Sequence, residues 1–200
     1  MKHVLALFLC CLFFTSPACG AQGPESSITM LQKAIDTMDP DLLEKYLDVE
    51  GLTQKGAAMA VEDPALLKRA SQYPALALMI AGLSGGARDG LIQLLAHETR
   101  SLVRYGVASG AFAGKPGTGE NPGDPGLMAP LLKGDERDRK KFGAVKILEK
   151  SDNYSRVATS LYDGVSKKSY PLELTLELSE DVWQVRKIVN LADLLRMADK

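Results

Sequence analysis

The residues best suited to covalent chemistry are a serine in a glycine-rich turn and a histidine on the segment that follows it. GLSGG at residues 82–86 matches the G-x-S-x-G pattern of serine hydrolases, in which a histidine folds back onto the serine. Outside residues 1–21 the only histidine is His97, which lies thirteen residues after Ser84 on the same expected helix as Asp89. One rigid helix does not bring these groups together. A turn between helices explains the motif better, and an esterase using Ser84 is kept only as a remote alternative.

Metal ligands and paired carboxylates are the next groups that could do chemistry. His97 alone cannot form a zinc site, which needs three or four protein ligands, and the acidic run 135–138 lacks the pattern of a calcium loop. Glu173 and Glu177 lie on one expected strand, about 13 Å apart, which is too far for the carboxylate pair of a glycosidase. The basic partners expected for them across the sheet are Arg186, Lys187 and Lys146. The sequence therefore predicts no catalytic residue, no metal and no cofactor, and indicates a protein that is not an enzyme.

These groups must be positioned by elements that the apolar pattern predicts, and the clearest of these is residues 170–180, YPLELTLELSE. Leu172, Leu174 and Leu176 alternate with polar residues, as in a β-strand with one buried face. In a helix the same leucines would scatter around the axis. We therefore expect an antiparallel strand whose apolar face is covered by helices of the N-terminal half.

The elements on either side predict an α+β fold, in which N-terminal helices pack on a C-terminal four-stranded antiparallel sheet. Asp39-Pro40 starts a second helix, because Asp can cap it and Pro fits its first turn. Gly51 is expected to interrupt the helical structure, so that a third helix begins after it. The first expected helix lies at 25–38, and the second runs from Pro40 to Leu47. The others are 52–61, 65–72, 74–83 and 87–110, with a short last one at 191–198. The expected strands are 142–149, 154–162, 169–179 and 182–190, joined as hairpins.

Two further details of this layout can be tested. Residues 114–126 are rich in Gly and Pro and are expected to form the surface loop between the helical part (25–110) and the sheet part (142–190). In the last strand Ile188 is out of phase with Trp183 and Val185, which predicts a β-bulge or burial on both faces.

The N-terminus has the features of a signal peptide over residues 1–21. Lys2 precedes an unbroken apolar run at 4–14, which is too short to span a bilayer, and small residues follow it. We therefore expect one exported domain at 22–200, in the periplasm, with no transmembrane span in the mature chain. Cys19 leaves open an alternative, a lipoprotein anchored to the membrane through this residue. All three cysteines (Cys10, Cys11 and Cys19) lie in this leader, so no disulfide is expected in the mature chain.

The charge of the mature chain is nearly balanced. Lys2 is the only charged residue of the leader, so its removal leaves 23 basic against 25 acidic residues, from 24 and 25 in the whole sequence. This balance argues against a nucleic-acid partner.

Three stretches carry a resemblance to a known superfamily: residues 34–52, 142–162 and 183–195. With the helix-then-sheet layout, they resemble the nuclear transport factor 2-like (cystatin-like, cone-shaped α+β) superfamily, and most closely its small exported bacterial families of unknown function. The resemblance implies a concave sheet face that tends to hold an apolar pocket. Superfamily members that are enzymes place polar catalytic groups inside the cone, and none of these can be matched to a position here. The layout is also similar to that of periplasmic phospholipid-carrier proteins.

Two functions of different classes follow. The first is a non-enzymatic envelope protein that binds a small apolar or lipid-like ligand between sheet and helices. The second is a protein–protein interaction or assembly module, with a possible envelope partner, whose core is filled by its own side chains. The candidate lining of the ligand site is Tyr162, Leu172, Leu174, Leu176, Trp183 and Val185, all of which ordinary core packing also explains.

Overall fold

The computed structural model describes residues 23–63, 88–117, 123, 126–128, 132 and 136–197. The expected signal peptide, the helices expected at 65–72 and 74–83, and the segment 82–86 that contains Ser84 lie outside the described residues. None of the described helices is both long enough and apolar enough to cross a bilayer.

The first three described helices are α2 (Pro24–Asp36), α3 (Pro40–Tyr46) and α4 (Val49–Glu62). The predicted start at Asp39-Pro40 is confirmed, because the Asp39 carboxylate accepts the N–H of Leu42 at 2.8 Å. The predicted break at Gly51 is wrong. Asp48 caps α4 by accepting the N–H of Gly51 at 2.9 Å, so the glycine lies in the first turn of the helix.

The long helix α7 (Arg88–Ala108) agrees with the prediction for 87–110 within two residues at each end. It ends in a buried turn at Ser109 to Ala111. There the Phe112 N–H donates to the Gly106 carbonyl at 2.8 Å and the Phe112 ring packs on Gly106, where a Cβ would lie 2.4 Å from the ring. The C-terminal end of α7 is thus fixed in the core.

The strands form one antiparallel sheet in which β3 is paired on both sides. They are β1 (Lys140–Phe142), β2 (Lys146–Lys150), β3 (Tyr154–Asp163), β4 (Lys168–Ser179) and β5 (Val182–Ile188). Both β1 and β2 pair with β3, at its two ends, and β4 lies between β3 and β5. The predicted meander is therefore confirmed, with its first strand divided in two.

The predicted irregularity of the last strand is a β-bulge. The register shifts where Thr175 pairs with Lys187 and Leu176 pairs with Val185, leaving Arg186 as the extra residue. The shift turns Ile188 back to the covered face. Beyond the end of β5, the Asn190 side chain extends the hydrogen bonding to β4. It accepts the Glu173 N–H at 3.0 Å and donates to the Pro171 carbonyl at 2.8 Å.

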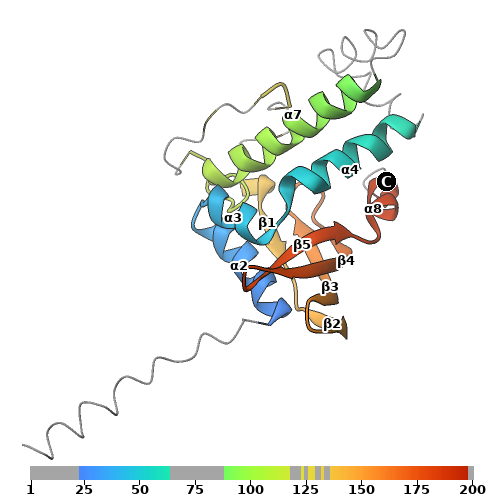
Figure 1. The fold of residues 1–200 in the computed structure, drawn as a ribbon. Helices are drawn as coiled ribbons and strands as arrows, with labels where there is room; N and C mark the ends of the chain where they lie inside the picture. The colour runs from blue at the N-terminus through green and yellow to red at the C-terminus, as the bar shows by residue number, and fades with distance from the viewer. Residues whose placement is uncertain are drawn as a thin grey trace, which may run out of the picture.

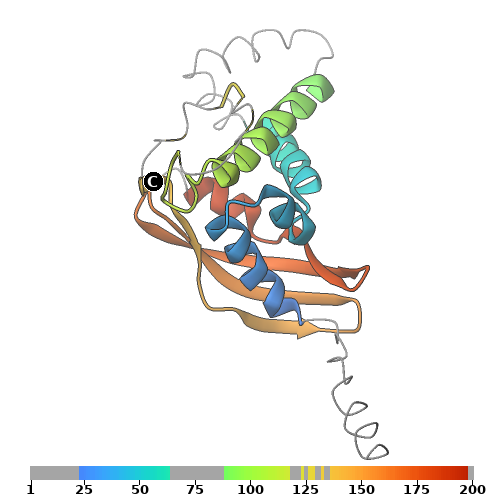
Figure 2. The same cartoon turned by 90° about the vertical axis from the view of Figure 1, so that its left-hand side faces the viewer.

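All the described helices lie on one side of the curled sheet, so the α+β architecture is confirmed (Figures 1 and 2). In Figure 2, α2 crosses the concave face, while α4 and α7 lie side by side above it. The link between α3 and α4 covers the edge of β5, where Leu47 forms a parallel bridge with Val185 and the Asp48 N–H donates to the Val185 carbonyl at 3.0 Å. Side chains of α2, β3, β4 and β5 meet in a core that includes Ile28, Leu31, Ile35, Val157, Leu174, Leu176 and Trp183.

Candidate functional site

The polar residues considered for chemistry are not brought together in the described part of the chain. His97 is exposed on α7, and Glu173 pairs with Arg156 of β3 at 3.1 Å rather than with the expected basic partners. Among the described residues, no three His, Cys, Asp or Glu side chains gather closely enough to hold a metal ion.

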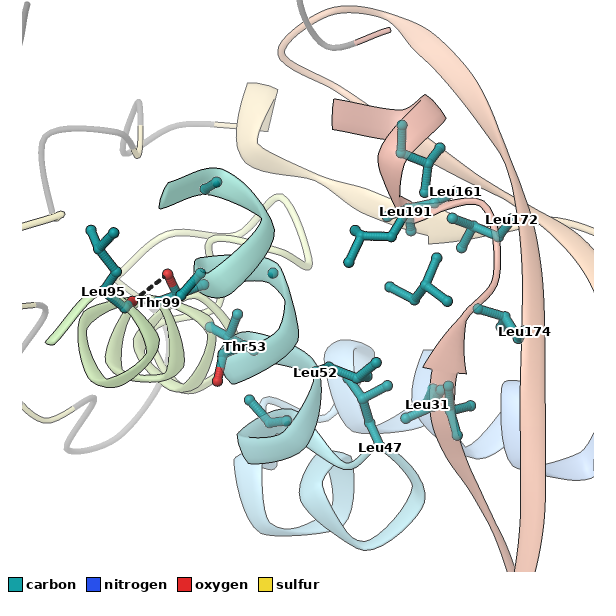
Figure 3. A pocket seen from close by; sticks show the side chains of 18 of the residues that line it. Leu31, Leu47, Leu52, Thr53, Leu95, Thr99, Leu161, Leu172, Leu174 and Leu191 are labelled. Carbon is teal, nitrogen blue, oxygen red and sulfur yellow. Dashed lines mark hydrogen bonds between the residues drawn. The ribbon is translucent and has the colours of Figure 1, made fainter. Parts of the chain in front are cut away.

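An apolar pocket of about 600 Å³ lies instead between the sheet and the helices (Figure 3). In Figure 3, Leu172 and Leu174 of β4 lie with Leu161 and Leu191 on one side of the pocket, and Leu52 of α4 lies on the other. The lining is mostly leucine and other aliphatic residues. Its described members are Leu31, Leu47, Val49, Leu52, Thr53, Gly56, Ala57, Ala60, Leu91, Leu95, Thr99, Val103, Met128, Phe142, Leu161, Leu172, Leu174, Val185, Ile188, Leu191 and Leu194.

Each of the two threonines of this lining donates a hydrogen bond to a carbonyl group of its own helix. Thr99 donates its hydroxyl to the Leu95 carbonyl at 2.7 Å, and Thr53 donates to the Glu50 carbonyl at 3.1 Å. Figure 3 shows Thr53 on the flank of α4 that faces Leu95 and Thr99 of α7. With these hydroxyl protons engaged, the described wall offers a ligand almost only hydrocarbon surface.

Three of the six residues expected at a ligand site line the pocket: Leu172, Leu174 and Val185. Leu176 and Trp183 are buried outside it, further along the same covered face.

The prediction that Tyr162 lies on the covered face of the sheet is wrong. Side chains alternate along β3, and Ser155, Val157 and Thr159 are its buried residues, so Tyr162 has the opposite parity and is exposed on the outer face.

The sequence reasoning missed the helical wall of the pocket. On α7 the lining residues recur every fourth position, at Leu91, Leu95, Thr99 and Val103, and this row was a readable signal of a helix face. On α4 the wall beyond Leu52 is made mostly by small residues (Gly56, Ala57 and Ala60), which carry no signal in an apolar pattern. Leu161 was missed because its strand was predicted only by its bounds, without assigning its residues to a face. Ile188 was missed because its place on the covered face depends on the bulge.

A buried carboxylate fixes one further part of the wall. Glu98 of α7 is 8% exposed and accepts the Leu127 N–H at 2.6 Å. Gly126, which precedes Leu127, has a φ of +69°, a conformation that favours glycine. A Cβ at this position would lie 2.5 Å from the Glu98 Oε2. These contacts hold Met128 against Thr99 at the pocket wall.

Outside the pocket, α7 is joined to α3 and α4 by ion pairs. Arg100 Nε lies 3.0 Å from Glu44 Oε1, and one guanidinium nitrogen of Arg104 lies 2.6 Å from Glu44 Oε2. Arg104 also pairs with Asp41 at 3.0 Å, and Arg100 with Glu50 at 3.3 Å. The hydrogen bond to Glu44 raises the pKa of the Arg100 guanidinium, although burial opposes it. The cluster fixes the outer flank of the helix whose other face lines the pocket.

A second ion pair joins β1 to β3 beside the pocket. Lys140 contacts Asp163, and the Asp163 carboxylate also accepts the N–H of Ser166 at 2.9 Å. Burial on its own raises the pKa of Asp163, but the hydrogen bonds from Lys140 and Ser166 outweigh it and lower the pKa to about 2. The pair holds β1, and with it the pocket residue Phe142, on the sheet.

No protein-family model, curated protein or solved structure matches the chain. The likeness to the nuclear transport factor 2-like superfamily therefore stays a prediction from the sequence.

Proposed function

We propose that this protein is a non-enzymatic protein of the bacterial envelope that binds a small apolar or lipid-like ligand between its sheet and its helices. The observation that carries the proposal is the apolar pocket of about 600 Å³ at this place. Ligand sites commonly have volumes of about 300–1,000 Å³ and mostly apolar walls. Export is supported by the expected signal peptide at residues 1–21.

The energetics of packing favour an occupant for such a space. Protein interiors are close-packed, with few voids larger than a water molecule, because atoms that face a void lose their dispersion contacts. Water gains little in a space whose wall offers few hydrogen bonds. An apolar ligand restores the contacts and removes its own apolar surface from water. The hollow favours this proposal over an interaction module with a filled core.

The proposal is tested by looking for an occupant and then for saturable binding. Purified protein is extracted with organic solvent and the extract is compared, by mass spectrometry, with an extract of unrelated protein prepared in the same way. A neutral dye that fluoresces in apolar surroundings is then titrated into the delipidated protein. We expect a co-purified apolar compound and saturable dye binding, and the absence of both contradicts the proposal.

A matched pair of variants ties the binding to the pocket. Ala60→Trp places a large side chain at the wall, whereas Leu148→Trp adds one on β2, where Leu148 is exposed outside the pocket. We expect Ala60→Trp to weaken dye binding at least tenfold and Leu148→Trp to leave it unchanged. Thermal unfolding of both variants, followed by circular dichroism, checks that each is folded. Equal weakening in both would mean that the dye binds elsewhere.

A further inference from the structure

The pocket is elongated, and its long direction follows the helices. Its row on α7 runs from Leu91 to Val103, about 18 Å at the rise of an α-helix, and its row on α4 runs from Leu52 through Gly56 to Ala60, about 12 Å. The two helices lie side by side in Figure 1. A space of about 600 Å³ spread over such a length is narrow.

The chemistry of the wall excludes polar groups from the enclosed part of a ligand. No charged or amide side chain occurs in the described lining, and the hydroxyls of Thr53 and Thr99 donate within their own helices. A carboxylate, phosphate or sugar inside would lose its hydrogen bonds to water without replacement, which is strongly unfavourable. Phe142 is the only aromatic residue of the described wall, so flat aromatic ligands would find little ring surface to stack on.

Gly56 has no role in the fold that the structure explains, except that it leaves room in the pocket. A Cβ at this position would meet no atom within 4 Å, and its φ is not in the left-handed region. Glycine inside a helix lowers the stability of the fold relative to alanine. Gly106 of α7 differs, because the Phe112 ring occupies the place of its side chain. The missing side chain at Gly56 widens the hollow where α4 faces it.

We infer that the pocket takes a single flexible aliphatic chain, laid lengthwise along α4 and α7, and that Gly56 sets the width that admits it. The inference rests on the proposed function and names its ligand class: a compound with one long alkyl or acyl chain whose polar end stays outside the pocket. Gly56 is a specificity-determining residue in this scheme, and the wall selects by length and thickness rather than by hydrogen bonds.

The test is competition against a bound neutral apolar dye, using purified, delipidated protein. One series of competitors is straight-chain primary alcohols of increasing length, kept below the concentrations at which they aggregate. The other is rigid polycyclic hydrocarbons of similar apolar area. Each added methylene is expected to tighten binding by about fourfold until the pocket is full, whereas the polycyclic compounds compete at least tenfold more weakly.

Three variants test whether Gly56 determines the width of the pocket. Gly56→Phe is expected to weaken the longest bound alcohol at least tenfold, while Gly56→Ala, whose methyl group meets no atom, changes it by less than threefold. Gly90→Ala is the control, since Gly90 is also helical with open space around it but lies outside the pocket. Circular dichroism melting shows that each variant is folded.

The possible failures are distinguishable. Dye that binds but is displaced equally well by polycyclic compounds, or an alcohol series with no dependence on length, overturns the chain-like ligand and leaves the proposed function standing. Wild-type behaviour of Gly56→Phe overturns the role of Gly56. Protein that binds no dye at all overturns the proposed function itself, and this inference with it.

Discussion

The covered face of the sheet is closely packed at one end and hollow at the other. At the packed end, Leu176 and Trp183 are buried in the core with Ile28 of α2 and do not line the pocket. At the hollow end, Leu172 and Ile188 face the pocket. The strand pattern is the same at both ends, since β4 supplies leucines at every second position throughout.

The difference lies in the helices that cover the two ends. The buried face of α2 carries branched side chains, Ile28 and Ile35, which fill the space above the sheet. The pocket face of α4 carries Val49 and Leu52 near its start, but further along it has Gly56, Ala57 and Ala60, which leave the space unfilled. The hollow is therefore determined by small residues on a helix and not by the strand. Two predictions test this contrast, and two more test the ion pairs that hold the elements around the hollow.

The largest effect is expected from truncating a leucine at each end of β4. Leu176 is 0% exposed in the packed end, and Leu172 is 8% exposed at the pocket. Leu176→Ala is expected to lower the free energy of unfolding by about 3–4 kcal/mol, because it opens a new cavity. Leu172→Ala is expected to lower it by about 1–2 kcal/mol, because part of its surroundings is already empty. Urea unfolding followed by circular dichroism measures both, and equal losses would show that the two ends are packed alike.

Adding one methyl group at two helical glycines should give effects of opposite sign. Gly106→Ala places a Cβ 2.4 Å from the Phe112 ring and is expected to destabilise the protein by about 1–3 kcal/mol. Gly56→Ala meets no atom within 4 Å and is expected to stabilise it by about 0.5–1 kcal/mol. The same unfolding measurement serves for both. A destabilising Gly56→Ala would mean that the space beside α4 is already filled.

The ion pair beside the pocket should appear as a dependence of stability on pH. The pKa of Asp163 is lowered to about 2 in the folded protein, from an ordinary value of about 3.9 in an unfolded chain. The stabilisation from its carboxylate is therefore complete above about pH 4 and is lost as the pH falls toward about 2. Asp163→Asn should abolish this part of the acid dependence, measured by urea unfolding at a series of pH values. An unchanged profile would show that Lys140 does not hold β1 through this group.

The smallest effect is expected from the ion pairs that join α7 to α3. Glu44 pairs with both Arg100 and Arg104, whereas Glu50 makes one contact at 3.3 Å and its side chain is 70% exposed. Glu44→Gln is expected to cost roughly 0.5–1 kcal/mol at low salt and less at 0.5 M salt, because partly exposed pairs are weak and screened. Glu50→Gln is the matched control, with no measurable change expected. A large loss from Glu44→Gln that salt does not reduce would point to packing rather than charge.

The sequence reasoning succeeded where a short-range pattern decides the structure. The alternation at 170–180 predicted β4 and its buried leucines, the Asp39-Pro40 pair predicted the start of α3, and the phase of Ile188 predicted the bulge. Each rests on residues within a few positions of one another.

The candidate site was less predictable, because it depends on which residues meet across the fold. Gly51 was expected to break a helix, but the side chain of Asp48 starts α4 just before it. Tyr162 was assigned to the covered face by its type rather than by its parity in β3. The hollow itself arises where the apolar face of β4 meets the small residues of α4, some 115 positions earlier in the chain. No pattern of neighbouring residues in the sequence indicates this contact between β4 and α4.

The link between α3 and α4 covers the edge of β5, and this contact affects how readily the protein can associate with itself. An open strand edge invites a strand of another molecule, which is a route to aggregation. Leu47 and Asp48 occupy the edge of β5 at Val185. At the opposite edge, β2 is exposed along its whole length, but it is short, irregular in register between Ile147 and Glu149, and flanked by Lys146 and Lys150. Growth of the sheet from one molecule into the next is thus opposed at both of its sides, by a covering segment at one and by charge and irregularity at the other.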